Sequence, residues 1–385
     1  MDFNKTDEQE LLLESIDEFF SQNPQFNEEY IRKCEKDHRP LSEYRQAMID
    51  AGFATLGIPE EFGGTPIDTV TLCLVAERFN LHGFPSYFGQ ILQVDDILAF
   101  GTPDQQKATM EALLNNEMYF SLGLSEPGAG SDTNAVSTSY VRKDDGKYVI
   151  TGHKTFCTDG DRAKNMLCLA RDFSVDDKPS KTMSCFLVPS DAPGVKMEPL
   201  TKVGTNWRSM TEVYLEDVVV DPTALVGKEH EGFMVVMKNF EIERLVIAAD
   251  CMGMAECAYK EALKYASERE QFGQPIGKFQ LIQEMLFEMR LRIDNMRNLV
   301  LKAAWERDNG DSIRISSSEA KYYCAREAFQ VIDDAMQIFG GYGYVGDPRV
   351  SRLWRDVRMN RLGGGTDQVM VYIAGKMLLK EAKRI

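Results

Sequence analysis

The most informative stretch of this sequence for the fold is SEPGAGSD, at residues 125–132. It follows a strand-like run, and its small residues would let backbone N–H groups approach a ligand closely. Ser125 and Ser131 add hydroxyl donors at its two ends. A bare Pro-Gly-x-Gly, however, is more typical of a tight surface turn. The stretch therefore predicts a turn or a ligand-binding loop, and the surrounding sequence has to distinguish them.

The periodicity of the chain changes on either side of this stretch. Residues 1–117 carry apolar residues at helical spacing, interrupted by Gly and Pro. Residues 118–230 hold short runs rich in Val, Thr, Tyr and Phe, without βαβ alternation. Residues 231–385 return to long 3.6-residue patterns. The prediction is an α+β protein with an N-terminal helical domain, a middle β-barrel or sandwich domain and a C-terminal four-helix bundle, with boundaries at these residues.

Individual elements are predicted more closely. Thr6 and Gln9 can form a capping box at the start of the first helix. Further helices are expected near 42–51, 68–79 and 104–115, and over 232–267, 279–308, 315–339 and 367–383. Strands are expected at 148–150, 166–169, 184–188 and 213–215, with a hairpin turn at residues 144–147, where Asp-Gly supplies positive φ.

The string GYGYVG at residues 341–346 matches the Gly-x-Gly-x-x-Gly pattern of dinucleotide-binding folds. A Rossmann fingerprint follows a strand and opens a helix. Here the string follows an amphipathic helical pattern and runs into Asp347-Pro348. We therefore reject a Rossmann site.

Composition narrows the function classes. The chain has 385 residues, 43% hydrophobic and 27% charged, which is ordinary for a soluble globular protein. Its net charge of −16 argues against nucleic-acid binding, which needs clustered Lys and Arg. No apolar run approaches the ~18 residues of a membrane span.

Cysteine and histidine usage adds two expectations. The eight cysteines show no Cys-x-x-Cys spacing and mostly lie in apolar patterns, which indicates buried thiols in a reducing compartment. The four histidines form no pair at metal-ligand spacing, so no metal site is predicted. Because the N-terminus resembles neither a signal nor a transit peptide, we expect a cytoplasmic protein.

Three stretches together resemble the acyl-CoA dehydrogenases, flavoenzymes that remove two hydrogens across the α and β carbons of an acyl thioester. They are SEPGAGSD, the strand-like GHKTFCTDG at residues 152–160, and EREQFGQPI at residues 268–276. For the first, the resemblance implies that Leu124 and Ser125 contact the flavin of FAD. It also implies that Gly130 binds FAD and that Ser131 lies near both the pyrophosphate and the thioester ligand.

For the second stretch, the resemblance implies that Phe156 packs on one face of the flavin ring and that Thr158 binds its N5 side. By itself, Phe156 is better explained as a core aromatic on a strand. The third stretch is similar to a family segment that reaches into a neighbouring subunit. There the arginine binds the flavin pyrophosphate, a task that suits a planar guanidinium.

Several cofactor contacts and the assembly follow from the same resemblance. FAD shared between subunits implies an obligate oligomer, usually a homotetramer. Implied contacts with FAD are Arg269, Gln271, Phe272, Ile276, Gln337, Gly341, Thr366 and Gln368.

The resemblance also concerns the catalytic base. Desaturation of a thioester needs a general base for the α proton, stabilisation of the enol oxygen, and an acceptor for the β hydride. Much of the family carries a glutamate where this chain has Gly364, and a minority carries it where this chain has Glu243. Asp367 corresponds to a position beside the flavin. The resemblance therefore implies Glu243 as the base, although a lone helix glutamate more often forms a salt bridge.

The residues that contact the substrate are also implied by the resemblance. It implies that a backbone N–H of Gly364 or a neighbour binds the thioester oxygen and that Arg244 lies near the CoA phosphates. The resemblance is closest to the crotonobetainyl-CoA reductase branch, associated with bacterial carnitine metabolism. It rests on MDFN at residues 1–4, FQLIQE at residues 279–284, WRD at residues 354–356 and the glycine-rich stretch that lacks the usual glutamate. That branch implies enoyl-CoA reduction with electrons from an electron-transfer flavoprotein. Phe84, Tyr87 and Phe88 lie in the segment that lines the acyl pocket in relatives, where they could surround a trimethylammonium group or simply shorten the pocket.

Other functions stay open from the sequence. One is a generic short- or branched-chain acyl-CoA dehydrogenase. Another is an acyl-CoA oxidase or flavin monooxygenase of the same fold, which would consume oxygen. A third is a non-catalytic flavin or CoA binder, which requires Glu243 to point away from the ligand.

Overall fold

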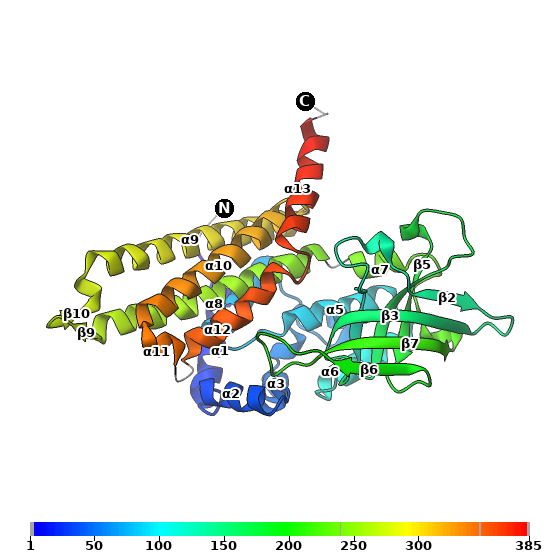
Figure 1. Ribbon diagram of the computed structural model, residues 1–385, viewed down its shortest axis with the longest axis horizontal. Helices are drawn as coiled ribbons and strands as arrows, with labels where there is room; N and C mark the ends of the chain where they lie inside the picture. The colour runs from blue at the N-terminus through cyan, green and yellow to red at the C-terminus, as the bar shows by residue number, and fades with distance from the viewer. Residues whose placement is uncertain (1–3, 239, 346–347, 383–385) are drawn as a thin grey trace. The chain divides into compact units, whose positions relative to one another are not determined.

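Helices, a β-sheet and helices again follow one another along the chain, as the sequence predicts (Figure 1). The computed structural model describes residues 4–238, 240–345 and 348–382, with the side chains of all of these except 88–93 and 381–382. Two compact units divide the chain. One comprises Met1–Tyr30, Leu56–Gly89 and Glu241–Ile385, and the other Ile31–Thr55 and Gln90–Phe240. The predicted fold class is confirmed; the three domain boundaries stay predictions.

The α-helices are α1 (Asp7–Gln22), α2 (Glu28–Lys36), α3 (Ser42–Asp50), α4 (Thr69–Leu81), α5 (Phe88–Phe100), α6 (Pro103–Leu114), α7 (Gly232–Met237), α8 (Phe240–Glu268), α9 (Gln280–Asp308), α10 (Ser316–Phe339), α11 (Gly341–Tyr344), α12 (Arg349–Val357) and α13 (Asp367–Ala382). Short 3₁₀ helices are η1 (Phe53–Thr55), η2 (Glu60–Phe62), η3 (Thr133–Ala135), η4 (Pro179–Lys181), η5 (Pro222–Ala224), η6 (Ile276–Lys278) and η7 (Arg358–Arg361).

The strands are β1 (Phe120–Gly123), β2 (Ser139–Arg142), β3 (Tyr148–Thr158), β4 (Asn165–Arg171), β5 (Met183–Pro189), β6 (Val195–Pro199), β7 (Met210–Val220), β8 (Leu225–Val226), β9 (Glu270–Gln271) and β10 (Gln274–Pro275).

The first helix of the helical unit begins at the predicted capping box. The Thr6 side chain accepts from the Gln9 backbone, and the Gln9 side chain accepts in return from the Thr6 backbone. Leu13, Ile16 and Phe19 lie buried on one stripe of α1. α4 begins where the Asp68 side chain accepts from the backbone of Thr71.

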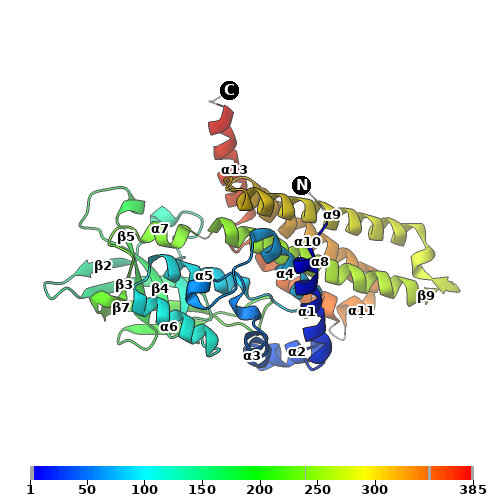
Figure 2. The same cartoon turned by 180° about the vertical axis from the view of Figure 1, so that it is seen from behind.

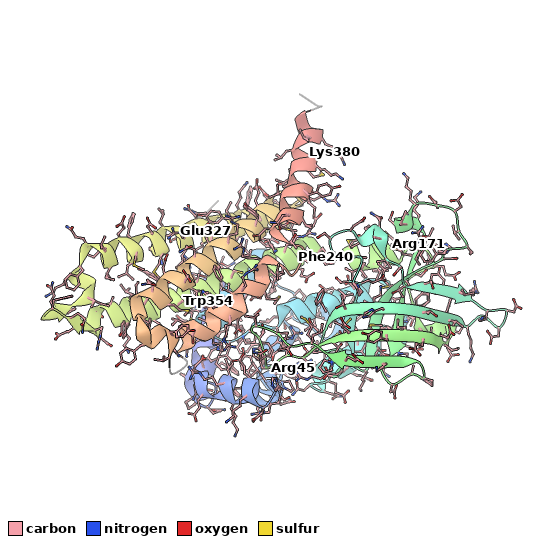
Figure 3. The ribbon with its side chains drawn as sticks, viewed as in Figure 1. Arg45, Arg171, Phe240, Glu327, Trp354 and Lys380 are labelled. Atoms are coloured by element: carbon pink, nitrogen blue, oxygen red, sulfur yellow. The ribbon has the colours of Figure 1, made fainter. Side chains whose placement is uncertain are left out.

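The long helices of this unit match the predicted C-terminal periodicity. α9 lies against α10, and α10 also contacts α12 and α13 (Figure 1). Gly253 on α8 lets α4 approach closely, because a Cβ there would lie 2.4 Å from the carbonyl oxygen of Glu77. α12 was not predicted; its Trp354, labelled in Figure 3, donates its indole N–H to Asp333 on α10 at 2.8 Å.

The other unit contains a sheet with strand order β6-β7-β3-β2-β4-β5-β8, in which β1 pairs with β4 in parallel. Two apolar clusters cover β4 and β5 on opposite faces. Met166 and Cys168 of β4 belong to one cluster, and Leu167 and Leu169 to the other. The period of two thus explains why the predicted strand 166–169 is apolar throughout. Ile97 of α5 joins the second cluster, and Figure 2 shows α5 in front of the sheet.

The predicted hairpin turn between β2 and β3 is confirmed, with Gly146 at φ +85°. The Gly-x-Gly-x-x-Gly string follows α10 and forms the short helix α11, with Gly346 outside the described residues. No strand precedes it, which agrees with rejection of a Rossmann site. The helix α5 was not predicted, because Gln90, Gln93, Asp95 and Asp96 interrupt its apolar residues.

Candidate active site

In the sheet unit, the SEPGAGSD stretch forms a tight exposed turn after β1. Glu126 and Ala129 exchange backbone hydrogen bonds of 3.1 and 3.0 Å. The Ser125 carbonyl accepts from the Thr155 N–H of β3 at 2.9 Å. Gly130 and Ser131 are exposed, whereas Leu124 and Ser125 are half-buried. The turn is therefore attached to β3 at one end and open to solvent at the other.

A buried ion pair between Glu126 and Lys154 anchors this turn. The carboxylate of Glu126 accepts from Lys154 Nζ at 2.7 Å, from the N–H and hydroxyl of Ser137 at 2.7 and 2.6 Å, and from the Thr138 N–H at 3.0 Å. Burial would raise the pKa of Glu126, but the charge of Lys154 and these donors outweigh it and lower that pKa to about 2. Both side chains are almost inaccessible to solvent. The turn thus rests on a fully satisfied polar anchor.

Phe156 lies on β3 where the pairing with β7 is interrupted. The register shifts between Lys154 and Cys157, as in a β-bulge, and Phe156 has φ +58°. Its side chain is 62% exposed, so its interpretation as a core aromatic is wrong. An exposed aromatic in a left-handed conformation indicates a functional surface. Thr158 follows at the end of the strand, and its carbonyl accepts from the Ser121 hydroxyl at 2.7 Å.

In the helical unit, Glu243 lies in the first turn of α8, three residues after Phe240, which Figure 3 labels. Its side chain is half-buried and makes no hydrogen bond or ion pair with any residue that the structure describes. Burial raises the pKa of Glu243 to about 7, although the charges of Arg244 and Lys321 oppose the rise. The alternative of a helix glutamate in a salt bridge is therefore wrong.

A glycine turn lies beside this carboxylate. Gly364 has φ +63° and Gly365 has φ +100°, both in the region that favours glycine. A Cβ added at Gly364 would lie 2.7 Å from Cδ1 of Ile247, one turn beyond Glu243 on the same face of α8. A glutamate at position 364 would therefore need a strained backbone and a displaced Ile247.

Two buried cations bind the carbonyls of this turn. Arg244 Nε donates to the Gly364 carbonyl at 3.1 Å, and Lys321 Nζ of α10 donates to the Gly365 carbonyl. In a trans peptide, the C=O of one residue and the N–H of the next point in opposite directions. These two bonds therefore aim the N–H groups of Gly365 and Thr366 away from the cations. Within the described part of the chain, the N–H groups of Gly364, Gly365 and Thr366 have no hydrogen-bond acceptor. Burial lowers the pKa of Lys321 to about 8.

The residues after the turn begin α13. The Thr366 hydroxyl accepts from the Val369 N–H at 3.2 Å. Asp367 is buried and accepts from Arg361 at 2.9 and 2.8 Å, so it is already paired. Gln368 is exposed.

A pocket of about 570 Å³ lies at the other end of α8. Four of the predicted cofactor contacts line it, namely Arg269, Gln271, Ile276 and Gly341. Its aromatic walls include Tyr265 and Phe339, stacked at 4.4 Å, and Tyr342, whose ring centre lies 5.7 Å from the guanidinium of Arg269. Phe272, 94% exposed, and Gln337, also exposed, do not line it.

Sequence reasoning did not identify three of these residues. Tyr265 precedes Arg269 by four residues, so helical periodicity could have placed both on one face of α8. Lys321 interrupts the buried stripe of Ala320, Cys324 and Ala328, and a lysine in such a stripe is a detectable signal. Tyr342 was obscured by the Rossmann-like string that contains it.

The sequence also predicts three aromatic residues, Phe84, Tyr87 and Phe88, in the segment of the acyl pocket. Phe84 is buried among the rings of Phe20, Phe26 and Tyr30, at 5.5 to 6.4 Å between centres, so it belongs to the core. Tyr87 has φ +58°. The side chain of Phe88 lies outside the described residues.

Comparison with known proteins agrees with this arrangement. Family models of acyl-CoA dehydrogenases match the chain with their N-terminal domain over residues 6–117, their middle domain over 121–218 and their C-terminal domain over 230–379. The chain therefore belongs to the acyl-CoA dehydrogenase family. It is 48% identical over 385 residues to "Probable acyl-CoA dehydrogenase YdiO" of Escherichia coli (strain K12), with 99% of each chain covered.

Solved structures give the same result. Butyryl-CoA dehydrogenase from Megasphaera elsdenii is 29% identical with a TM-score of 0.88, covering 98% of this chain and 100% of its own. A chain from the structural study of the electron transferring flavoprotein of Acidaminococcus fermentans is 32% identical with a TM-score of 0.89 and the same coverage. The prediction that the protein is an acyl-CoA dehydrogenase enzyme is thus confirmed.

Three expectations from composition concern the cysteines, membrane spans and metal ligands. All eight cysteines are free and buried, as predicted. Among the helices that the structure describes, none is both long and apolar enough for a bilayer crossing. Across the described ranges, no three His, Cys, Asp or Glu side chains gather in a way that could hold a metal ion.

Proposed function

We propose that this protein is an FAD-dependent oxidoreductase that acts on the α,β carbon–carbon bond of a short acyl-CoA, with Glu243 as the group that moves the α proton. The observation that carries the proposal is the Glu243 carboxylate, which has no hydrogen-bond or ion-pair partner among the described residues and whose pKa of about 7 lies near working pH. Its neighbours Arg244 and Ile247 lie against the glycine turn, whose N–H groups have no acceptor in the same described part of the chain. A paired carboxylate with an ordinary pKa would be a weaker base.

The chain's own residues account for proton transfer in three parts. Glu243 accepts the α proton in dehydrogenation and donates it in enoyl-CoA reduction. N–H groups of the glycine turn stabilise the negative charge that develops on the thioester oxygen. Arg244 and Lys321 act as positioning residues, because they hold the carbonyls of Gly364 and Gly365 and so aim the N–H groups. The CoA-phosphate contact of Arg244 stays a prediction.

The cofactor sites fit a flavin adenine dinucleotide. Exposed Phe156 offers a ring face, and the anchored turn offers Leu124, Ser125, Gly130 and Ser131. The pocket with Arg269 and three aromatic rings suits an adenine and a pyrophosphate. When bound, FAD supplies the acceptor for the β hydride, or its donor in reduction. Contacts of Thr158, Phe272, Gln337, Thr366 and Gln368 with FAD stay predictions.

The proposed assembly is a homotetramer. The pocket-bearing end of the helical unit exposes Phe272, Leu281, Phe287 and Leu291, at 94%, 75%, 68% and 49%. Exposed apolar residues gathered in this way mark interaction surfaces. An electron-transfer flavoprotein is the proposed redox partner, supported by the similarity to a chain studied with such a flavoprotein. Free buried cysteines support a reducing compartment, the cytoplasm.

The proposed substrate pair is crotonobetainyl-CoA and γ-butyrobetainyl-CoA, from the family branch that the sequence resembles. A generic short-chain acyl-CoA dehydrogenase differs only in the acyl group. An oxidase or monooxygenase would require rapid reaction of the reduced protein with oxygen, which an oxygen electrode would detect.

The test is an anaerobic titration of the purified protein with short acyl-CoAs, including butyryl-CoA and γ-butyrobetainyl-CoA, followed by flavin absorbance. We expect bleaching by at least one of them. Glu243→Gln should retain flavin and ligand affinity and lose turnover by about 10³-fold, within the range of general-base catalysis. Glu241→Gln, on the same helical turn and paired with Arg314, is the matched control and should keep its turnover. Near-normal turnover in Glu243→Gln, or absence of bound flavin, would contradict the proposal.

A further inference from the structure

A second carboxylate on the face of α8 that carries Glu243 has no cation as its partner among the described residues. Asp250 follows Glu243 by seven residues, which is two helical turns, so both side chains leave α8 on nearly the same side. Seven residues at a rise of ~1.5 Å separate them by about 10 Å along the helix. Ile247, which contacts the glycine turn, lies between them on this face.

The partners of Asp250 are neutral. Its Oδ1 accepts from Asn80 Nδ2 at 2.6 Å and from the Ser86 hydroxyl at 2.9 Å. Within the described residues, Asp250 has no ion pair, and its Oδ2 has no hydrogen-bond donor. Burial raises the pKa of Asp250 to about 7, against the two hydrogen bonds, with no nearby cation contributing.

Other shielded carboxylates in this unit have cations. Glu28 pairs with Arg352 at 2.9 Å, Glu261 with Arg349 at 3.1 Å, and Asp367 with Arg361 at 2.8 Å. An ordinary structural explanation would give Asp250 such a cation too, because an uncompensated buried charge is costly. The fold instead brings two neutral donors to a single oxygen and leaves the second oxygen available.

A close helix contact and a left-handed backbone residue lie next to Asp250 and its two donors. Gly253, one turn further along α8, lets α4 approach closely enough for Asn80 to reach Asp250. Ser86 is 1% exposed, and the next residue, Tyr87, has φ +58°. Strained backbone of this kind persists where the surrounding structure requires it, and it is concentrated at ligand sites.

We propose that Asp250 is a specificity-determining residue that binds a positively charged nitrogen at the far end of the acyl group. The inference rests on the proposed function of Glu243. A four-carbon acyl chain with a terminal ammonium matches the span of about 10 Å between the two carboxylates, once a contact distance is allowed at each end. The substrate's ammonium then supplies the positive charge that no described side chain gives to Asp250. A quaternary ammonium suits the site, because Oδ1 is already satisfied and a charge without N–H donors needs only proximity.

The experiment compares two acyl-CoAs of equal shape. One is γ-butyrobetainyl-CoA, and the other is its neutral isostere, in which carbon replaces the quaternary nitrogen. Rates of anaerobic flavin bleaching give kcat/KM for each. We expect the wild type to prefer the cation, and Asp250→Asn to lose about 10²-fold of that preference while its rate with the neutral isostere changes little, because one partner of a desolvated charge pair has been removed.

Glu261→Gln on the same helix is the matched control, because Glu261 already has Arg349 as its cation, and it should leave the preference unchanged. If the wild type reacts with both probes equally, or if Asp250→Asn keeps the wild-type preference, the assignment of Asp250 is wrong while the proposed function stands. A wild type that shows no preference for the cation overturns the assignment even if the variant does not fold. If no acyl-CoA bleaches the flavin of the wild type, the proposed function itself fails.

Discussion

Two carboxylates, one in each unit of this protein, have opposite environments. In the sheet unit, Glu126 receives four hydrogen bonds, one of them from the buried Lys154, and its pKa falls to about 2. In the helical unit, Glu243 receives none from the described residues, and its pKa rises to about 7. A carboxylate that holds a loop is satisfied by the fold. A carboxylate that the fold leaves unsatisfied is available to a proton or a ligand, at a cost in stability.

The largest expected effect comes from breaking the satisfied pair. Lys154→Met leaves the charge of Glu126 buried without its cation, and the free energy of unfolding should fall by about 3–5 kcal/mol. Denaturant titration of the apoprotein measures the loss. The double variant Lys154→Met with Glu126→Gln should recover part of it, because no buried charge remains.

Lys147→Met is the control for this prediction. Lys147 pairs with Asp221 at 3.2 Å in the same unit, but both side chains are exposed, so the expected change is about 0–1 kcal/mol. Equal losses in the two lysine variants would show that the buried pair is no anchor.

A smaller effect of opposite sign is expected at the unsatisfied carboxylate. The folded pKa of Glu243 lies above its value of 4.5 in an unfolded chain, so stability falls as pH rises from 4.5 to 7 and stays reduced above 7. Glu243→Gln should therefore stabilise the apoprotein at pH 8 by about 1–2 kcal/mol, less than the full shift because the side chain is part-exposed. Thermal unfolding at pH 8 and at pH 4 would measure this, and the gain should vanish at pH 4.

Glu241→Gln provides the comparison for the same helix. Because Glu241 pairs with Arg314 at 3.5 Å, its removal should not stabilise the protein at either pH. Stabilisation by both substitutions would point to net charge as the cause, and not to the missing partner of Glu243.

The smallest effect concerns pH dependence. For dehydrogenation, kcat/KM should rise with pH as Glu243 loses its proton near pH 7; for enoyl-CoA reduction it should fall over the same range. The positive charge of Lys321 lowers the pKa of Glu243, so Lys321→Gln, which keeps an N–H donor, should move the profile to higher pH. Lys321→Arg keeps the charge and should not move it. A profile that is unchanged in Lys321→Gln would contradict the electrostatic role of Lys321.

The sequence predicts the fold well where a periodic pattern is long. α9, α10 and the strands β4 and β5 follow from apolar spacing, and α1 from its capping box. α5 was missed because its polar residues, Gln90, Gln93, Asp95 and Asp96, are spread among the apolar ones and leave no clear apolar stripe in the sequence. α12 was missed because it is short and rich in arginine, and its place depends on partners distant in sequence such as Glu28.

The candidate site was predictable in part. Motif resemblance selects Glu243, Arg269 and Gly341, but it cannot show that Glu243 lacks a partner, which depends on the whole fold. The role of Asp250 is invisible in the sequence, because its donors lie on and after α4, about 165–170 positions away. Phe156 shows the opposite error, since its strand pattern indicates burial while a bulge turns it outward.

The glycine at position 364 also bears on how such enzymes can change over time. Returning the base from α8 to the glycine turn would need a side chain at φ +63°, a smaller residue at position 247, and loss of Glu243. Each change alone would harm stability or activity before the next could compensate. The proposed place of the base on α8 is thus coupled to the glycine at position 364, so that these positions would have to change together.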